Sequence, residues 1–206
     1  MNIKMILGIP ALLGALATVL PGCAGVVIAG AGTAAYVASQ NRTTGTVIDD
    51  ENIDLKASTA IREDKQLADQ AHISVTSFNY VVLLTGEAPT AELRERAERL
   101  AAKAPKVQSV YNEVIIAAPS SMGSRSTDTW ITTKAKTALV GAEGLEAWDA
   151  TRVKVVTERG TVYLMGLVTR QEGEAATEAV RRVDGVQRVV RLFQYTDTPT
   201  SPTPAS

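Results

Sequence analysis

The sequence predicts an α+β fold made of two copies of one small module, each running helix-strand-strand-helix-strand. An internal repeat is the first observation: the runs 73–75 and 82–86 recur as 153–155 and 162–166 when the chain is shifted by 80 residues. The second is the alternation of apolar residues in these runs, which is typical of short strands with one buried face. The third is a helical spacing of apolar residues before and after each pair of strands.

The first helix of copy one is predicted from four apolar residues at i, i+4, i+7 and i+8, which lie on one helical face. These residues are Ile53, Ala57, Ala60 and Ile61. Two short β-rich runs follow at 73–76 and 81–85, with Asn79 between them, where a tight turn tolerates positive φ. In copy two the same turn holds Gly160, which adopts that conformation without strain.

The second helix of copy one is predicted to begin at a Thr90 cap and to end near Lys103, after which 107–116 returns as the last strand. A tight turn makes the first two strands antiparallel, whereas a strand-helix-strand link forces a parallel crossover. Each copy is therefore expected to form a mixed three-stranded sheet packed on two helices. Because modules of about 70 residues have thin cores, the two copies can pack against each other, although the sequence alone does not show that they do.

The N-terminus has the pattern of an export signal with a lipid attachment site. Lys4 is the only charged residue before Arg42, an apolar run covers 5–20, and Leu20-Pro21-Gly22-Cys23 follows. A short positive start, an apolar stretch and small residues before a cleavage site are typical of a secretory signal. A cysteine directly after the cut resembles the lipobox of bacterial lipoproteins, so Cys23 is the predicted acylated N-terminus. The alternative is a transmembrane helix, but a run of about 16 residues is shorter than the roughly 20 that cross a bilayer.

The predicted organisation has six segments, which follow from the signal, the repeat and the composition of the links. They are a signal peptide at 1–22, a lipidated N-terminus and tether at 23–48, a first domain at 49–117, a linker at 118–127, a second domain at 128–195 and a tail at 196–206. The linker is rich in Gly, Ser and Pro, and the Pro/Thr composition of the tail is typical of disorder.

The composition excludes several classes of protein. Of the 206 residues, 21 are Lys or Arg and 22 are Asp or Glu, a balance that argues against a nucleic-acid binder. The single cysteine excludes a disulfide framework and a multi-cysteine zinc site. His72 begins a strand without a partner histidine or cysteine and is interpreted as a tolerated polar residue, while Ser120, Ser121 and Ser124 lie in the linker. No enzyme activity, metal site or cofactor is predicted, apart from the covalent lipid on Cys23.

The repeat resembles the BON domain, and three stretches carry the resemblance: 128–134 (Asp-Thr-Trp-Ile-Thr-Thr-Lys), 162–169 and 110–113. Two such domains behind a lipobox are similar to the dual-BON outer-membrane lipoproteins of Gram-negative bacteria. That resemblance implies an anchor in the outer membrane facing the periplasm, a role in envelope integrity, and enrichment at the cell-division site. It also implies that the partners are anionic phospholipids, phosphatidylglycerol included, bound through the first helix of the second domain.

The two copies differ most in the face of the first helix beside its core stripe. The second copy has Trp130, Lys134, Thr137 and Gly141 there, whereas the first has Asn52, Lys56, Thr59 and Glu63 and no aromatic residue. A Trp beside a Lys is typical of membrane interfaces. Residues 119–206 also carry 11 basic and 10 acidic side chains, against 8 and 12 in 49–118. An anionic surface therefore repels the second domain less than the first.

The lipid-binding residues implied by the resemblance are carried over onto this helix. They are Trp130, Ile131, Thr133 and Lys134, with Thr137 on the same flank; Ile131 also belongs to the core stripe, and Lys136 is a weaker candidate elsewhere on the helix. Two alternatives stay open. The first is that Trp130 fills the edge of a thin core. The second is that the protein is a protein–protein adaptor, which docks an envelope partner through the exposed sheet or the acidic first domain.

Overall fold

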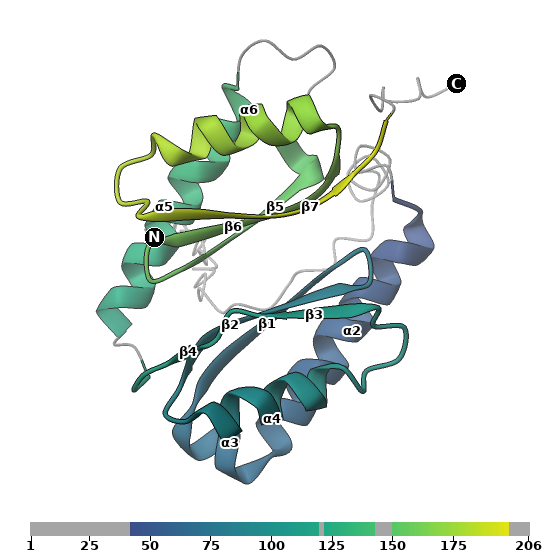
Figure 1. Ribbon diagram of the computed structural model, residues 1–206, viewed down its shortest axis with the longest axis vertical. Helices are drawn as coiled ribbons and strands as arrows, with labels where there is room; N and C mark the ends of the chain where they lie inside the picture. The colour runs from purple at the N-terminus through teal and green to yellow at the C-terminus, as the bar shows by residue number, and fades with distance from the viewer. Residues whose placement is uncertain (1–41, 120–121, 143–149, 198–206) are drawn as a thin grey trace, which may run out of the picture.

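The computed structural model describes residues 42–119, 122–142 and 150–197, which form two domains of related topology (Figure 1). The first domain comprises α2 (Thr44–Glu63), α3 (Lys65–Gln70), β1 (His72–Phe78), β2 (Val81–Ala88), α4 (Ala91–Ala101), β3 (Ser109–Asn112) and β4 (Ile115–Ile116). The second comprises α5 (Met122–Val140), the 3-10 turn η1 (Ala150–Arg152), β5 (Val153–Glu158), β6 (Thr161–Val168), α6 (Arg170–Arg181) and β7 (Arg188–Tyr195). The predicted signal peptide, Cys23 and most of the tether lie outside the described residues, as does most of the tail.

Both sheets are mixed, as the sequence predicts. In the first domain β1 is antiparallel to β2, and β2 is parallel to β3 and β4. In the second, β5 is antiparallel to β6, and β6 is parallel to β7. The predicted α+β fold with two repeated units is thereby confirmed.

The last strand of the first domain departs from the expected single run over 107–116. It is interrupted after Asn112, whose side-chain amide donates to the carbonyl oxygen of Arg94 at 3.0 Å and accepts from the N–H of Val114 at 3.3 Å. Because the N–H of Val114 bonds to this side chain, it does not continue the strand pairing. Val114 turns into the core, and β4 forms as a separate short strand. The sheet consequently has four strands instead of the expected three.

The first helix of each domain also begins earlier than the repeat suggests. Thr43 caps α2, since its hydroxyl oxygen accepts the N–H of Thr46 at 3.1 Å, and the helix therefore extends into the segment expected as a tether. Helix α5 begins at Met122, inside the segment expected as a linker. None of the helices in the described part of the chain is both long and apolar enough to span a bilayer.

A buried aspartate in each of these helices holds the hairpin turn of its own domain. The carboxylate of Asp128 accepts the N–H groups of Arg159 at 2.8 Å and Gly160 at 2.9 Å. Asp50 does the same for the turn residues Asn79 and Tyr80, at 2.6 and 2.8 Å. Both residues of each turn have positive φ. The N–H groups of these two residues are left without a partner on the strands, and the carboxylate accepts them. Tyr80 therefore stands where the second domain has its turn glycine.

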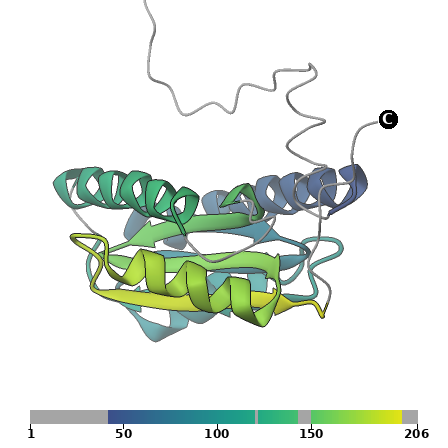
Figure 2. The same cartoon turned by 90° about the horizontal axis from the view of Figure 1, so that it is seen from above.

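The sheet faces that carry no helices pack against each other, so that the molecule has four layers, helices-sheet-sheet-helices (Figure 1). This contact is apolar at its centre. The residues that form it are Phe78, Val81, Leu83, Tyr163 and Met165, with Val156, Leu167, Val190 and Leu192 around them. Polar contacts surround the apolar centre: Lys154 donates to the carbonyl oxygen of Ser77 at 3.0 Å and lies 3.7 Å from Asp54 on α2. Helices α2 and α5 lie along the same side of this sandwich (Figure 2).

Candidate functional site

The exposed face of α5 is the most distinctive apolar surface of the second domain. Trp130 is 63% exposed, and Val140 lies exposed at the end of the same helix. Thr133 and Thr137 are exposed between them. At about 100° per residue these four side chains lie within an arc of roughly 80°, so they form one continuous face, called here the Trp130 face.

The threonines of this face present their methyl groups because their hydroxyls are used inside the helix. The hydroxyl of Thr133 donates to the carbonyl oxygen of Thr129, and that of Thr137 to the carbonyl oxygen of Thr133, each at 3.1 Å. A threonine bonded to the carbonyl four residues earlier has its hydroxyl satisfied without water. The Trp130 face is therefore more apolar than its composition suggests.

The charges of α5 are favourable for an anionic partner. Its one acidic residue, Asp128, is buried and occupied by the hairpin turn, whereas its basic residues are Arg125, Lys134 and Lys136. Helix α2, which lies along the same side of the molecule, has two basic residues, Lys56 and Arg62, against four acidic residues besides the buried Asp50: Asp49, Glu51, Asp54 and Glu63. A negatively charged surface is thus attracted to α5 and repelled by α2.

The structure separates the predicted site residues into two groups. Trp130, Thr133 and Thr137 are exposed, and the alternative that Trp130 fills the edge of the core is wrong. Lys134 is half-buried at the side of the face, where its ammonium group donates to the carbonyl oxygen of Asp184.

The prediction of Ile131 as a surface contact is wrong. This side chain is 3% exposed and belongs to the core of the second domain. One position along a helix is a rotation of about 100°, which turns it away from Trp130 and toward the sheet. It packs so closely on the loop before β7 that a Cβ at Gly185 would lie 3.0 Å from its side chain.

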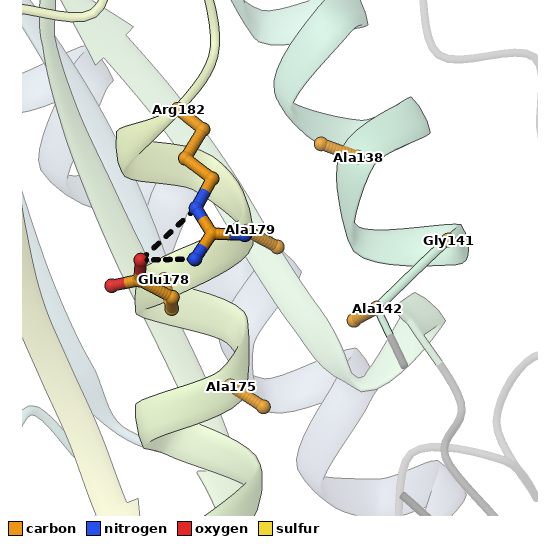
Figure 3. Close-up of a pocket in the computed structure, with 7 residues that line it drawn as sticks. All are labelled: Ala138, Gly141, Ala142, Ala175, Glu178, Ala179 and Arg182. Atoms are coloured by element: carbon orange, nitrogen blue, oxygen red, sulfur yellow. Dashed lines mark hydrogen bonds and ion pairs between the residues drawn. The ribbon is translucent and has the colours of Figure 1, made fainter. Parts of the chain in front are cut away.

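A groove lies between α5 and α6 (Figure 3). It adjoins the Trp130 face, because its lining residues Ala138 and Gly141 directly follow Thr137 and Val140 of that face. It is lined by Ala138, Gly141, Ala142, Ala175, Glu178, Ala179 and Arg182. The guanidinium group of Arg182 donates twice to Glu178, at 3.0 and 2.7 Å. Glu178, which also lies 3.0 Å from Arg181, thus holds the guanidinium group that lines the groove. The Trp130 face has an exposed indole and no carboxylate, and it remains the better candidate.

A second cluster, which sequence reasoning missed, lies at one end of the contact between the two sheets. It consists of His72 and Glu87 from the first domain and Glu158 from the second. Strand register places His72 opposite Glu87, but only the stacking of the two sheets brings Glu158 to them. No pattern within either repeat reveals that contact.

The two domains match a known family. The model of the BON domain matches residues 49–118 and 127–197, which together cover most of the chain, so the protein belongs to the BON domain family. It is similar to the outer membrane lipoprotein DolP of Haemophilus influenzae, with 36% identity over 178 residues that span 86% of this chain and 91% of the relative. It is also similar to the 21 kDa hemolysin of Actinobacillus pleuropneumoniae, with 38% identity over 154 residues, 75% of this chain and 78% of the relative.

Solved structures add little to this assignment. The C-terminal domain of CdsD, a structural protein of the type III secretion system of Chlamydia trachomatis, overlaps 71% of this chain and 67% of its own with 15% identity. At a TM-score of 0.28 the overlap gives no information about function.

Proposed function

We propose that this protein is an outer-membrane lipoprotein, anchored through Cys23 and facing the periplasm, whose second BON domain binds anionic phospholipid through the Trp130 face. It acts as a binding protein and not as an enzyme. The observation that carries the proposal is the exposure of Trp130 at one end of a helix face that has no exposed carboxylate. The relative named as an outer membrane lipoprotein supports the membrane location.

The physical argument joins an amphipathic ring with nearby cations. An indole is favoured at the level of the lipid headgroups, where its ring is partly buried and its N–H is hydrated. Each basic residue near an anionic leaflet contributes about 1 kcal/mol, so Lys134 and Lys136 together contribute about 2 kcal/mol. An acyl chain on Cys23 would hold the domain at the membrane, and the high effective concentration of lipid would make a weak headgroup contact well occupied.

Phosphatidylglycerol is the proposed lipid, and the proposal includes a role in envelope integrity and in functions at the cell-division site. The resemblance to dual-BON lipoproteins supports these parts. The lipid-binding face itself is supported by the geometry of α5 described above.

Vesicle flotation tests the lipid step. The protein used is the chain from residue 24, which lacks the lipid anchor and retains every described element. We expect it to float with phosphatidylglycerol vesicles but not with phosphatidylcholine vesicles, and the bound fraction to fall as salt is raised. Trp130→Glu should reduce binding at least tenfold. Leu55→Glu is the matched control, because Leu55 is 61% exposed on the first helix of the other domain; equal loss in both variants would contradict the proposal.

The adaptor alternative is favoured by one observation. Tyr111, Ile115 and Ile116 are exposed at the edge of the first sheet, on β3 and β4, and exposed apolar residues beside an open strand edge can pair with another chain. A crosslinked partner that Trp130→Glu retains, but that deletion of 49–118 loses, would support the adaptor against the lipid binder.

A further inference from the structure

Three side chains with metal-binding atoms meet where the two domains touch. His72 is the first residue of β1, Glu87 is its partner on β2, and Glu158 is the last residue of β5. One ligand atom from each lies within 4.8 Å of the other two. The cluster therefore exists only when the two sheets are stacked.

The distance between the ligand atoms of His72 and Glu87 suits a coordinated ion better than a direct hydrogen bond. His72 Nδ1 lies 3.4 Å from Glu87 Oε2, which is longer than the usual 2.9–3.0 Å or so for N–H···O. Tetrahedral zinc with bonds of about 2.0–2.1 Å to N and O separates neighbouring ligand atoms by about 3.3–3.4 Å. Nδ1 of His72 and Oε1 of Glu158 are both shielded from solvent and have no hydrogen-bond partner in the described part of the chain.

The surroundings favour a cation. The side chain of Glu87 is 0% exposed. The charges of Glu87 and Asp128 both act on Glu158, so negative charge surrounds the cluster. Arg159 offsets part of this negative charge, with Nη1 3.5 Å from Glu87 Oε1, but its side chain is 47% exposed and is free to turn into solvent when an ion takes its place.

The backbone next to the cluster has a close approach of β1 to β2 that requires a glycine. Gly86, beside Glu87, has φ +112, and a Cβ there would lie 2.0 Å from the carbonyl oxygen of His72. Only glycine permits this approach of β1 to β2. The position of the imidazole relative to Glu87 is therefore fixed by the sheet and does not depend on a flexible loop.

We propose that His72, Glu87 and Glu158 bind a divalent transition-metal ion, Zn²⁺ in the first place, with water as the fourth ligand. One imidazole nitrogen and two carboxylates are donors that zinc accepts, and a site with three protein ligands leaves one position open. Because the ligands come from both domains, the ion links them, and it stabilises the stacked arrangement by binding only that state. This site is independent of the Trp130 face and of lipid binding.

Metal titration of the full chain, extracted in detergent and without a polyhistidine tag, tests the site. With Zn²⁺ followed by calorimetry we expect one ion per chain, a melting temperature that falls when EDTA removes it, and with Co²⁺ the visible absorption of tetrahedral coordination. His72→Gln and Glu158→Gln should each weaken Zn²⁺ binding at least tenfold. Glu178→Gln, which changes a carboxylate on α6 far from the cluster, should not change it.

A fourth variant gives an effect of opposite sign. Arg159→Asn removes the competing cation, while asparagine tolerates the φ of 50° that this position requires, so we expect at least threefold tighter Zn²⁺ binding. No saturable binding by the wild-type chain, or unchanged affinity in His72→Gln and Glu158→Gln, overturns the proposal. Should His72→Gln fail to fold, Glu158→Gln and Arg159→Asn decide, and unchanged affinity in both overturns it.

Discussion

The buried carboxylate of Asp128 is expected to contribute more to stability than any other polar group on α5. It accepts two backbone N–H groups of the β5–β6 turn, at 2.8 and 2.9 Å, and is itself buried. A hydrogen bond to a charged group is worth about 1.5–3 kcal/mol, and an N–H left unsatisfied in a buried site loses its full solvation. Because Gly160 N–H is buried and Arg159 N–H only partly so, we expect Asp128→Ala to lower the free energy of unfolding by about 3–4 kcal/mol.

Urea unfolding followed by circular dichroism measures this loss. Asp128→Asn keeps one acceptor oxygen, so about half of the loss is expected, near 1.5–2 kcal/mol. Asp69→Ala, an exposed aspartate on α3, serves as the control and should change stability by less than about 0.5 kcal/mol. If Asp128→Ala is as stable as Asp69→Ala, the carboxylate does not hold the turn.

Three further predictions concern the domain contact and the Trp130 face. Burial raises the pKa of Asp54 to about 6, so the folded state binds the proton of this carboxyl more tightly than the unfolded state does. Protonated Asp54 therefore favours folding below about pH 4, and this stabilisation is lost as the pH rises through 6. Asp54→Asn should therefore stabilise the protein by about 1–3 kcal/mol at pH 7 and not at pH 4. Thermal melts in which the variant gains no more over the wild type at pH 7 than at pH 4 would contradict this. Met165→Ala removes a buried side chain from the contact between the sheets and should lower the urea-derived free energy of unfolding by about 2–4 kcal/mol; a loss below 1 kcal/mol would mean that the sheets do not pack in solution. Val140→Glu, at the other end of the Trp130 face, should reduce flotation with phosphatidylglycerol vesicles about three- to tenfold, and unchanged flotation would confine the contact to the Trp130 end.

The internal repeat was sufficient to predict the topology of both domains, because the periods of strands and helices are local properties of the chain. It did not predict the end of β3, since that break depends on the side chain of Asn112 accepting the N–H of Val114. Nor did it predict the early starts of α2 and α5, which lie in Gly/Ser/Thr-rich segments typical of loops.

The candidate site was predicted in part. The exposed position of Trp130 follows from its place beside the core stripe of the helix, whereas Ile131 satisfied both the core pattern and the family motif, and burial decided between them. Val140 was missed because the motif ends before it. His72 was interpreted as a tolerated polar residue, since its neighbour Glu158 is 86 positions away and meets it only across the two sheets.

The fluorescence of Trp130 in the presence of vesicles shows whether its indole enters the headgroup region of an anionic membrane. The chain has two tryptophans, so in Trp148→Phe all indole emission comes from Trp130. We expect a blue shift and protection from a water-soluble quencher on adding phosphatidylglycerol vesicles, with neither change on adding phosphatidylcholine vesicles. Emission and quenching that stay the same with both lipids, while the protein remains folded, would contradict lipid binding through Trp130.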